Sequence, residues 1–206
     1  GEASAFDISP DGKFLLLRLY PPEGSRGADI AVRDLARGTA VSFGNVTGHA
    51  WAPDAALLAF IVETETGAAN AVQLYDAHSG TLRVLDSSPS RYRGLAWRDD
   101  ARDLVVLRAL PDSAHRDTAH AAIAWRGLGN GDPQRFDLDP RRTSQIPEGM
   151  RISETRTPEW TDDGSIVLLG LRPRQPVRDT AVVVAAETPG DEKRSDVQVW
   201  HARDVR

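Results

Sequence analysis

Short, uninterrupted apolar runs recur along the chain, and each one directly follows a turn sequence. Runs this short, rich in β-branched and large aliphatic residues, are typical of strands rather than buried helices. Because apolar residues occupy consecutive positions, both faces of such a strand must be covered, as in the middle of a sheet stacked between two other layers. The predicted strands are 14–17, 57–62, 104–107 and 166–169.

A phrase made of an aromatic residue, a spacer and a turn precedes each run. Sequences such as Ser9-Pro10-Asp11-Gly12 favour tight turns, so each run is expected to be the second strand of a hairpin. The turn aspartates lie at intervals of 43, 46 and 63 residues, and the first two intervals are in or beside the roughly 40–50 residue period of propeller blades. The four copies of the phrase are Phe6 to Gly12, Trp51 to Asp54, Trp97 to Asp100 and Trp160 to Gly164.

Further strands complete each unit. A third strand is expected at 30–34, 72–76, 122–126 and 197–201, and a fourth at 39–43 and 81–85 after the turns at Arg37-Gly38 and Ser79-Gly80. The pattern therefore predicts an all-β protein, a β-propeller of four-stranded antiparallel blades. The expected blades span approximately 3–46, 47–89, 91–138 and 152–206.

The fourth unit is less regular than the others. Residues 139–158 are expected to be an extended linker that packs no core, and residues 172–195 to be an insertion whose centre, 180–187, is a short helix or an extra strand. The sequence stops after the third strand of this unit. We therefore expect these four blades to belong to a larger propeller of seven or eight blades, with open edges that aggregate or pair with residues outside this sequence.

Charge and composition exclude several function classes. The 25 basic residues are scattered singly against 30 acidic ones, giving a net charge of −5 that argues against nucleic acid as a partner. No apolar stretch approaches the roughly 20 residues of a membrane-spanning helix. The absence of cysteine excludes disulfides, thiolate zinc sites and cysteine nucleophiles, and it leaves the compartment open.

No catalytic, cofactor or metal site is predicted. No serine has the Gly-x-Ser-x-Gly setting of a nucleophile elbow. His115 and His120 are five residues apart, which is expected to place them on opposite faces of one strand and disfavours a shared metal. His49 is expected to bond to a strand or turn group.

The remaining polar and aromatic motifs fit structural roles. The glycine-rich stretch 127–132 is interpreted as a hairpin with a type I′ turn at Asn130-Gly131, rather than as a phosphate loop. The acidic pairs 99–100 and 162–163 are expected to cap their own turns rather than bind calcium. Trp51, Trp97 and Trp160 recur at one place in the repeat and are expected to pack between blades.

Two carboxylates form the candidate binding site. Glu63 and Glu65 follow the second apolar strand, on the kind of loop where propellers present ligand contacts. We interpret them as substrate-binding residues for a cationic peptide terminus. A solvated loop is the alternative.

The repeated phrase resembles the repeat of TolB-type propellers and of the propeller domains of the prolyl oligopeptidase family of serine peptidases. The final segment, Ser195 to Arg206, resembles a blade strand of bacterial members of that family, in which an Asp-Val-x-Val-Trp sequence precedes a charged turn. The resemblance covers essentially the whole chain.

This resemblance implies a non-catalytic N-terminal propeller that gates peptide access to a separate C-terminal α/β-hydrolase domain. The family's serine, aspartate and histidine would lie in that domain, so the implied partners are the hydrolase domain and peptide substrates. A periplasmic or secreted location is favoured over a cytoplasmic one by family habit. One alternative is a TolB-like or WD-like propeller that acts as a protein-binding scaffold. Another is a propeller lactonase or glycosidase, for which only Asp7 and Glu159 lie near suitable inner-strand positions.

Overall fold

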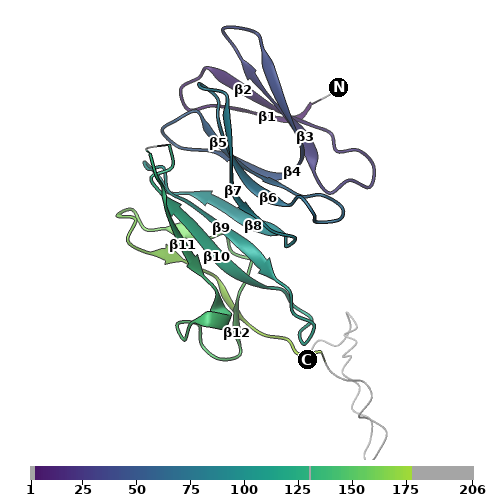
Figure 1. Cartoon of the computed structure of the whole chain (residues 1–206), viewed down its shortest axis with the longest axis vertical. Helices are drawn as coiled ribbons and strands as arrows, with labels where there is room; N and C mark the ends of the chain where they lie inside the picture. Colours follow the sequence, from purple (N-terminus) through teal and green to yellow (C-terminus); the bar gives the residue numbers. More distant parts are fainter. Residues whose placement is uncertain (1–2, 130, 178–206) are drawn as a thin grey trace, which may run out of the picture. The chain divides into compact units, whose positions relative to one another are not determined.

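The computed structural model describes residues 3–129 and 131–177, and antiparallel β-strands make up its regular structure (Figure 1). The first two blades form one seven-stranded sheet in which the strands follow their chain order. These strands are β1 (Ala3–Ile8), β2 (Phe14–Leu19), β3 (Ala28–Asp34), β4 (Ala40–Trp51), β5 (Leu57–Val62), β6 (Ala71–Asp76) and β7 (Thr81–Ser87).

Strand β4 belongs to both of these blades. Its first part, from Ala40 to Val46, pairs with β3, and its second part, from Val46 to Trp51, pairs with β5. The strand changes partner next to Asn45, whose φ is 58°. A Cβ on Gly27 would lie 2.4 Å from the Asn45 carbonyl carbon, so the close approach of β3 to this bend requires glycine.

The third blade is a separate four-stranded meander, in the order β11-β10-β9-β8 across the sheet (Figure 1). The fourth unit contains two short strand pairs, β12 with β15 and β13 with β14. Residues 153–158 leave the ladder between β12 and β13, so the inner strand of this unit is interrupted. The bounds are β8 (Tyr92–Trp97), β9 (Leu104–Leu110), β10 (Ala119–Arg126), β11 (Gln134–Leu138), β12 (Met150–Ile152), β13 (Glu159–Trp160), β14 (Val167–Leu168) and β15 (Leu171–Pro173), with a 3-10 turn at Pro140–Arg142.

The hydrophobic core lies between blades. Along β5, Leu57, Ala59 and Ile61 pack against buried residues of the third blade, including Leu104 and Ile123. The alternate residues Leu58 and Phe60 pack against the first blade. The prediction that the apolar strands are covered on both faces is therefore confirmed for 57–62 and 104–107, but not for 166–169, where Ile166 is 56% and Leu168 is 45% exposed.

The all-β fold class and the strands predicted within residues 3–177 are confirmed, but the predicted linker is not merely a connection. Ile152 is fully buried and packs against Leu107 and Ala122 of the third blade. The expectation that residues 139–158 pack no core is therefore wrong. The apolar pattern misses β12 because the excursion at 153–158 separates it from the tryptophan that marks the repeat.

Two predicted features of the fourth unit lie outside the described residues. These are the third strand at 197–201 and the insertion from residue 178 onward, including its centre at 180–187. Among the residues that the structure describes, no helix is long and apolar enough to cross a membrane.

The glycine-rich stretch forms a hairpin, as predicted. Arg126 pairs with Gln134 at the ends of β10 and β11. Leu128 of this loop is fully buried in the core shared with the second blade. Asn130 lies outside the described residues, so its type I′ turn stays a prediction.

The predicted capping of turns by their own aspartates is confirmed at Asp163, whereas no hydrogen bond of this kind is found for Asp99 or Asp100 among the described residues. Asp163 accepts hydrogen bonds from the Ser165 backbone N–H (2.9 Å) and the Thr161 hydroxyl (2.6 Å). These bonds lower the pKa of Asp163 to about 2. The tryptophan prediction holds at Trp97, whose Nε1 donates to the Ala50 carbonyl of the preceding blade at 3.0 Å.

Candidate functional site

Charged side chains gather at one end of the blades. In a four-stranded meander, the loop between the second and third strands lies at the same end of the blade as the connection from the fourth strand to the next blade. We call this the loop end; it contains residues 20–27, 63–70, 88–91, 111–118 and 139–149. The opposite end contains the repeated aspartate turns.

Glu63 lies at the loop end, directly after β5, as the sequence predicted. Its side chain is only 2% exposed, and its carboxylate forms an ion pair with Arg93 of β8. Glu63 therefore links the second and third blades. Glu65 is exposed in the same loop.

Three arginines surround Glu63. Arg26, Thr47, Glu63, Arg91 and Arg93 line a hollow of about 430 Å³, which we call the arginine hollow. Three arginines and one carboxylate line the hollow, so it carries net positive charge although the whole chain is negative. Sequence reasoning missed this group because Arg26 and Glu63 are far in the sequence from Arg91 and Arg93, and only the pairing of blades brings them together.

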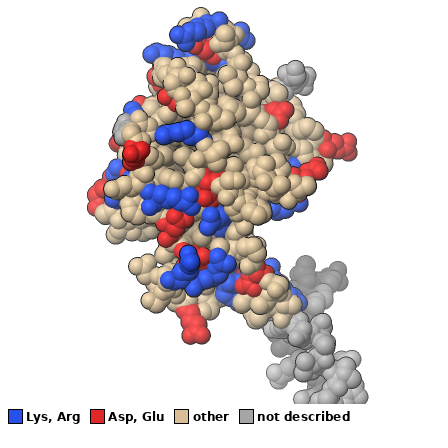
Figure 2. Space-filling model, viewed as in Figure 1, with Lys and Arg blue, Asp and Glu red and all other residues tan. Residues whose placement is uncertain are grey.

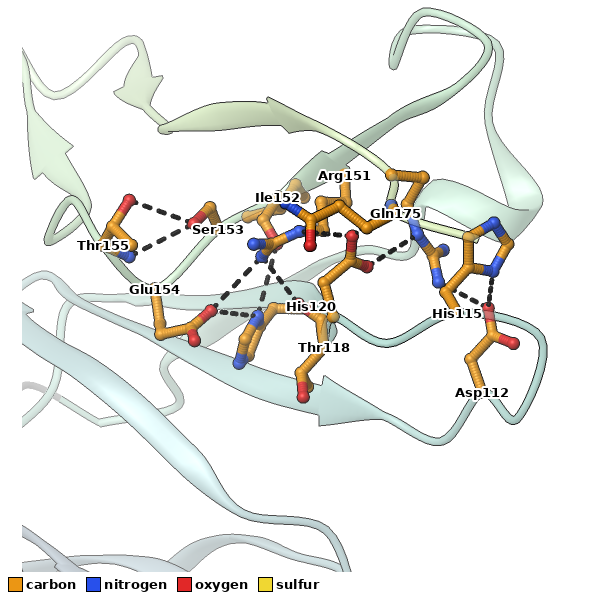
Figure 3. Close-up of polar contacts among 12 residues, drawn as sticks. Asp112, His115, Thr118, His120, Arg151, Ile152, Ser153, Glu154, Thr155 and Gln175 are labelled. Atoms are coloured by element: carbon orange, nitrogen blue, oxygen red, sulfur yellow. Dashed lines mark hydrogen bonds and ion pairs between the residues drawn. The ribbon is translucent and has the colours of Figure 1, made fainter. Parts of the chain in front are cut away.

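A second group of charged residues joins the third blade to the fourth (Figure 3). Arg151 of β12 is at its centre, with a side chain that is 9% exposed. Its Nη1 donates to the Thr118 carbonyl at 2.8 Å, its Nε lies 3.5 Å from Asp117 Oδ2, and its Nη1 lies 3.5 Å from Glu154 Oε2. We call this group, with the residues described next, the Arg151 cluster.

A second arginine extends the cluster toward the loop before β10. Arg174 Nε lies 3.1 Å from Asp117 Oδ1, so Asp117 is placed between two guanidinium groups. Arg174 Nη2 contacts Asp112 Oδ2 at 2.5 Å, and His115 Nδ1 lies 3.0 Å from the same oxygen. The Ala114 backbone N–H and Arg174 both lower the pKa of Asp112.

His120 forms the buried end of the cluster. Its Nδ1 lies 3.3 Å from the Ile152 carbonyl and 3.3 Å from Glu154 Oε2 (Figure 3). Burial lowers the pKa of His120, and the Glu154 carboxylate opposes this shift only in part. Burial between the two blades therefore favours the neutral form of the imidazole.

The expectation that His115 and His120 share one strand is wrong, because β10 begins at Ala119 and His115 lies in the preceding loop. Within residues 3–129 and 131–177, no group of three or more His, Asp or Glu side chains is arranged to hold a metal ion. The acidic groups of the Arg151 cluster are matched by arginines. This arrangement suits the cluster to joining blades.

We expect acidification to destabilise the chain through His120. Because the folded-state pKa is lowered, the unfolded state binds the proton more readily, and the free energy of unfolding falls as pH drops below the unfolded value of about 6.5. Urea denaturation at pH 7.5 and 5.5 measures this loss, and His120→Gln should reduce it. An identical pH dependence in wild type and His120→Gln would contradict the assignment.

The remaining candidates are separate from these two groups. Asp7 accepts a hydrogen bond from the Ile8 backbone N–H at 2.8 Å, and exposed Glu159 pairs with Arg156 at 3.2 Å. His49 is partly buried near Arg18, and both burial and that charge lower its pKa. The hydrogen bond predicted for the His49 ring is not found in the part of the chain that the structure describes.

Charges of both signs alternate over the visible surface (Figure 2). Basic side chains lie beside acidic ones, without an extended area of basic charge on that face.

Comparisons with known proteins match this chain to solved structures. No family model and no curated protein sequence matches it. Similar structures include hydrazine synthase of Kuenenia stuttgartiensis, at 20% identity over 82% of this chain and 49% of that one, with a TM-score of 0.48. The β-propeller domain of the trilobed protease from Pyrococcus furiosus is 15% identical over 86% of this chain and 57% of that one, with a TM-score of 0.47. TolB from Acinetobacter baumannii is 16% identical over 84% of this chain and 38% of that one, with a TM-score of 0.40.

The chain therefore spans less than two thirds of the length of each of these structures. The neighbours include propellers of both kinds that the repeat phrase resembles, one from a protease and one of the TolB type.

Proposed function

We propose that this chain is a non-catalytic part of a larger β-propeller that gates peptide access to a separate α/β-hydrolase domain of a serine peptidase. The observation that supports this most directly is the arginine hollow, which lies where the inner strands of two adjacent blades begin. Thr47 is in the inner strand of the second blade, and Arg93 is in the inner strand of the third. Inner strands line the central channel of a propeller, so a charged hollow here faces the route of a peptide.

The exposed side of the first blade supports a larger ring. Every residue of β1 is exposed, and this includes Phe6 at 73% and Ile8 at 49%. Each of the other blades buries apolar side chains against a neighbour. A further blade beside β1 would cover these side chains in the same way.

A protein-binding scaffold is the second candidate, and the outer strands favour it. Val41 in β4, Leu82 and Val84 in β7, and Phe136 in β11 are all between 44% and 58% exposed. Outer strands of three blades thus present apolar side chains on the circumference. A partner protein that spans several blades would cover them.

The gating function is tested by assaying the full-length parent protein on two substrates. One is a set of short peptide amides, and the other is a folded protein whose amino-acid composition matches that of the peptides. We expect cleavage of the short peptides, no cleavage of the folded protein, and loss of activity with a serine-directed inhibitor. Residues 1–206 alone are the control and should cleave neither substrate. If the parent protein cleaves neither substrate but binds a partner protein through its outer strands, the result would support the scaffold function instead.

A further inference from the structure

The arginine hollow contains positive charge that the described residues leave unmatched. Of its three arginines, only Arg93 forms an ion pair, with Glu63. Neither Arg26 nor Arg91 has an ion-pair partner between residues 3 and 177, Asn130 aside, and both side chains are exposed. Other exposed arginines, such as Arg33 and Arg83, also lack an ion pair among the described residues, but they do not line this hollow.

The hollow also contains an unused hydrogen-bonding group. Thr47 Oγ1 is buried, and it has no hydrogen-bond partner among the residues that the structure describes. Thr47 lines the same hollow as the two unpaired arginines. A buried hydroxyl without a partner costs free energy unless a ligand or water satisfies it.

Glu63 holds one side of the hollow in place. Its buried carboxylate fixes Arg93, and its backbone N–H donates to the Asn45 carbonyl at 2.9 Å. Arg93 Nη1 also donates to the Tyr92 carbonyl at 2.7 Å. The Arg93 guanidinium is therefore already occupied, which leaves Arg26 and Arg91 as the arginines of the hollow that can pair with a ligand.

We propose that the arginine hollow binds a carboxylate group of a peptide, with Arg26 and Arg91 as its ion-pair partners and Thr47 as a hydrogen-bond donor. The planar guanidinium fork matches the geometry of a carboxylate and can donate two parallel hydrogen bonds to it. The proposal rests on the proposed function only in taking peptides as the ligands. The sequence predicted that Glu63 and Glu65 bind a cationic peptide terminus, whereas the group bound in the hollow is anionic.

The first test compares peptides on the unmodified chain. Pentaalanine labelled at its N-terminus with a fluorophore is titrated with the chain as the free acid and as the C-terminal amide, and binding is followed by fluorescence anisotropy. We expect the free acid to bind at least about tenfold more tightly, which is the effect of losing one charge-assisted contact. A third peptide, amidated but ending in aspartate, shows whether a side-chain carboxylate serves as well as the terminus.

The second test removes the arginines. The double variant R26A/R91A should lose most of the preference for the free acid. The control is the double variant R33A/R37A, at exposed arginines of the first blade that do not line the hollow. It changes the net charge by the same amount and should retain the preference for the free acid. Thermal unfolding of both variants checks that each is folded.

Equal binding of the free acid, the amide and the aspartate peptide would overturn the proposal, and so would equal losses in the two double variants. Hydrolysis by the parent protein is a separate measurement. If the parent protein cleaves no peptide while the chain still prefers carboxylates, the gating function fails and the binding site stands.

Discussion

Replacing Phe60 by alanine is expected to lower the free energy of unfolding by about 3–5 kcal/mol. The Phe60 ring is fully buried and packs on the Phe43 ring, with 4.7 Å between the ring centroids. It belongs to the core that joins the first blade to the second, so its loss leaves a cavity between these two blades that cannot collapse freely. Urea denaturation followed by circular dichroism measures the change.

Phe136→Ala provides the matched control, because this phenylalanine is 48% exposed on the outer strand β11. Its removal should change stability by less than about 1 kcal/mol. If Phe60→Ala costs no more than Phe136→Ala, the core between the first two blades is not the one described here.

The second large effect is expected at Asp86, which connects the second blade to the third. Its buried carboxylate accepts hydrogen bonds from the Tyr92 hydroxyl at 2.7 Å and Arg108 Nη1 at 3.0 Å, and it lies 2.9 Å from Arg135 Nη1. Asp86→Ala should lower the free energy of unfolding by about 3 kcal/mol, because it leaves the buried Tyr92 phenol and the Arg108 guanidinium without their acceptor and removes one of the two carboxylates that pair with Arg135. This is the lower end of the usual range, since the two arginines are partly exposed.

Asp137→Ala separates this effect from the simple loss of a charge. Asp137 also pairs with Arg135, at 2.8 Å, but its side chain is 46% exposed. Exposed ion pairs contribute little, so this variant should lose less than about 1 kcal/mol in the same denaturation experiment. Similar losses for the two aspartates would show that burial of Asp86 is not what makes it important.

The strands that lie in the middle of each blade could be predicted from the sequence, and the reason is their burial. A strand covered on both faces needs consecutive apolar residues, and Leu57–Val62 carries that signal without interruption. Strand β12 carries no such signal, because only three residues pair before the chain leaves the ladder. The excursion that follows depends on contacts with the third blade that a local pattern does not contain.

The candidate site was predictable only where it directly follows a strand. Glu63 was found because it comes immediately after β5, but the sequence gives no sign that Arg93 neutralises it. Arg26 and Arg91 are ordinary surface residues in a linear view, and the pairing of blades makes them neighbours in one hollow. The Arg151 cluster has the same origin, since its members come from three separate segments of the chain.

The continuity of β4 determines where the blades can part. Main-chain hydrogen bonds run from the first blade into the second through this strand, so no seam exists between those two blades. The second and third blades have separate sheets, and side-chain contacts such as Glu63 with Arg93 and Asp86 with Arg108 close the boundary between them. Opening a ring at this boundary would therefore break no strand pairing, but it would expose the apolar core that Leu57 shares with Leu104 and Ile123.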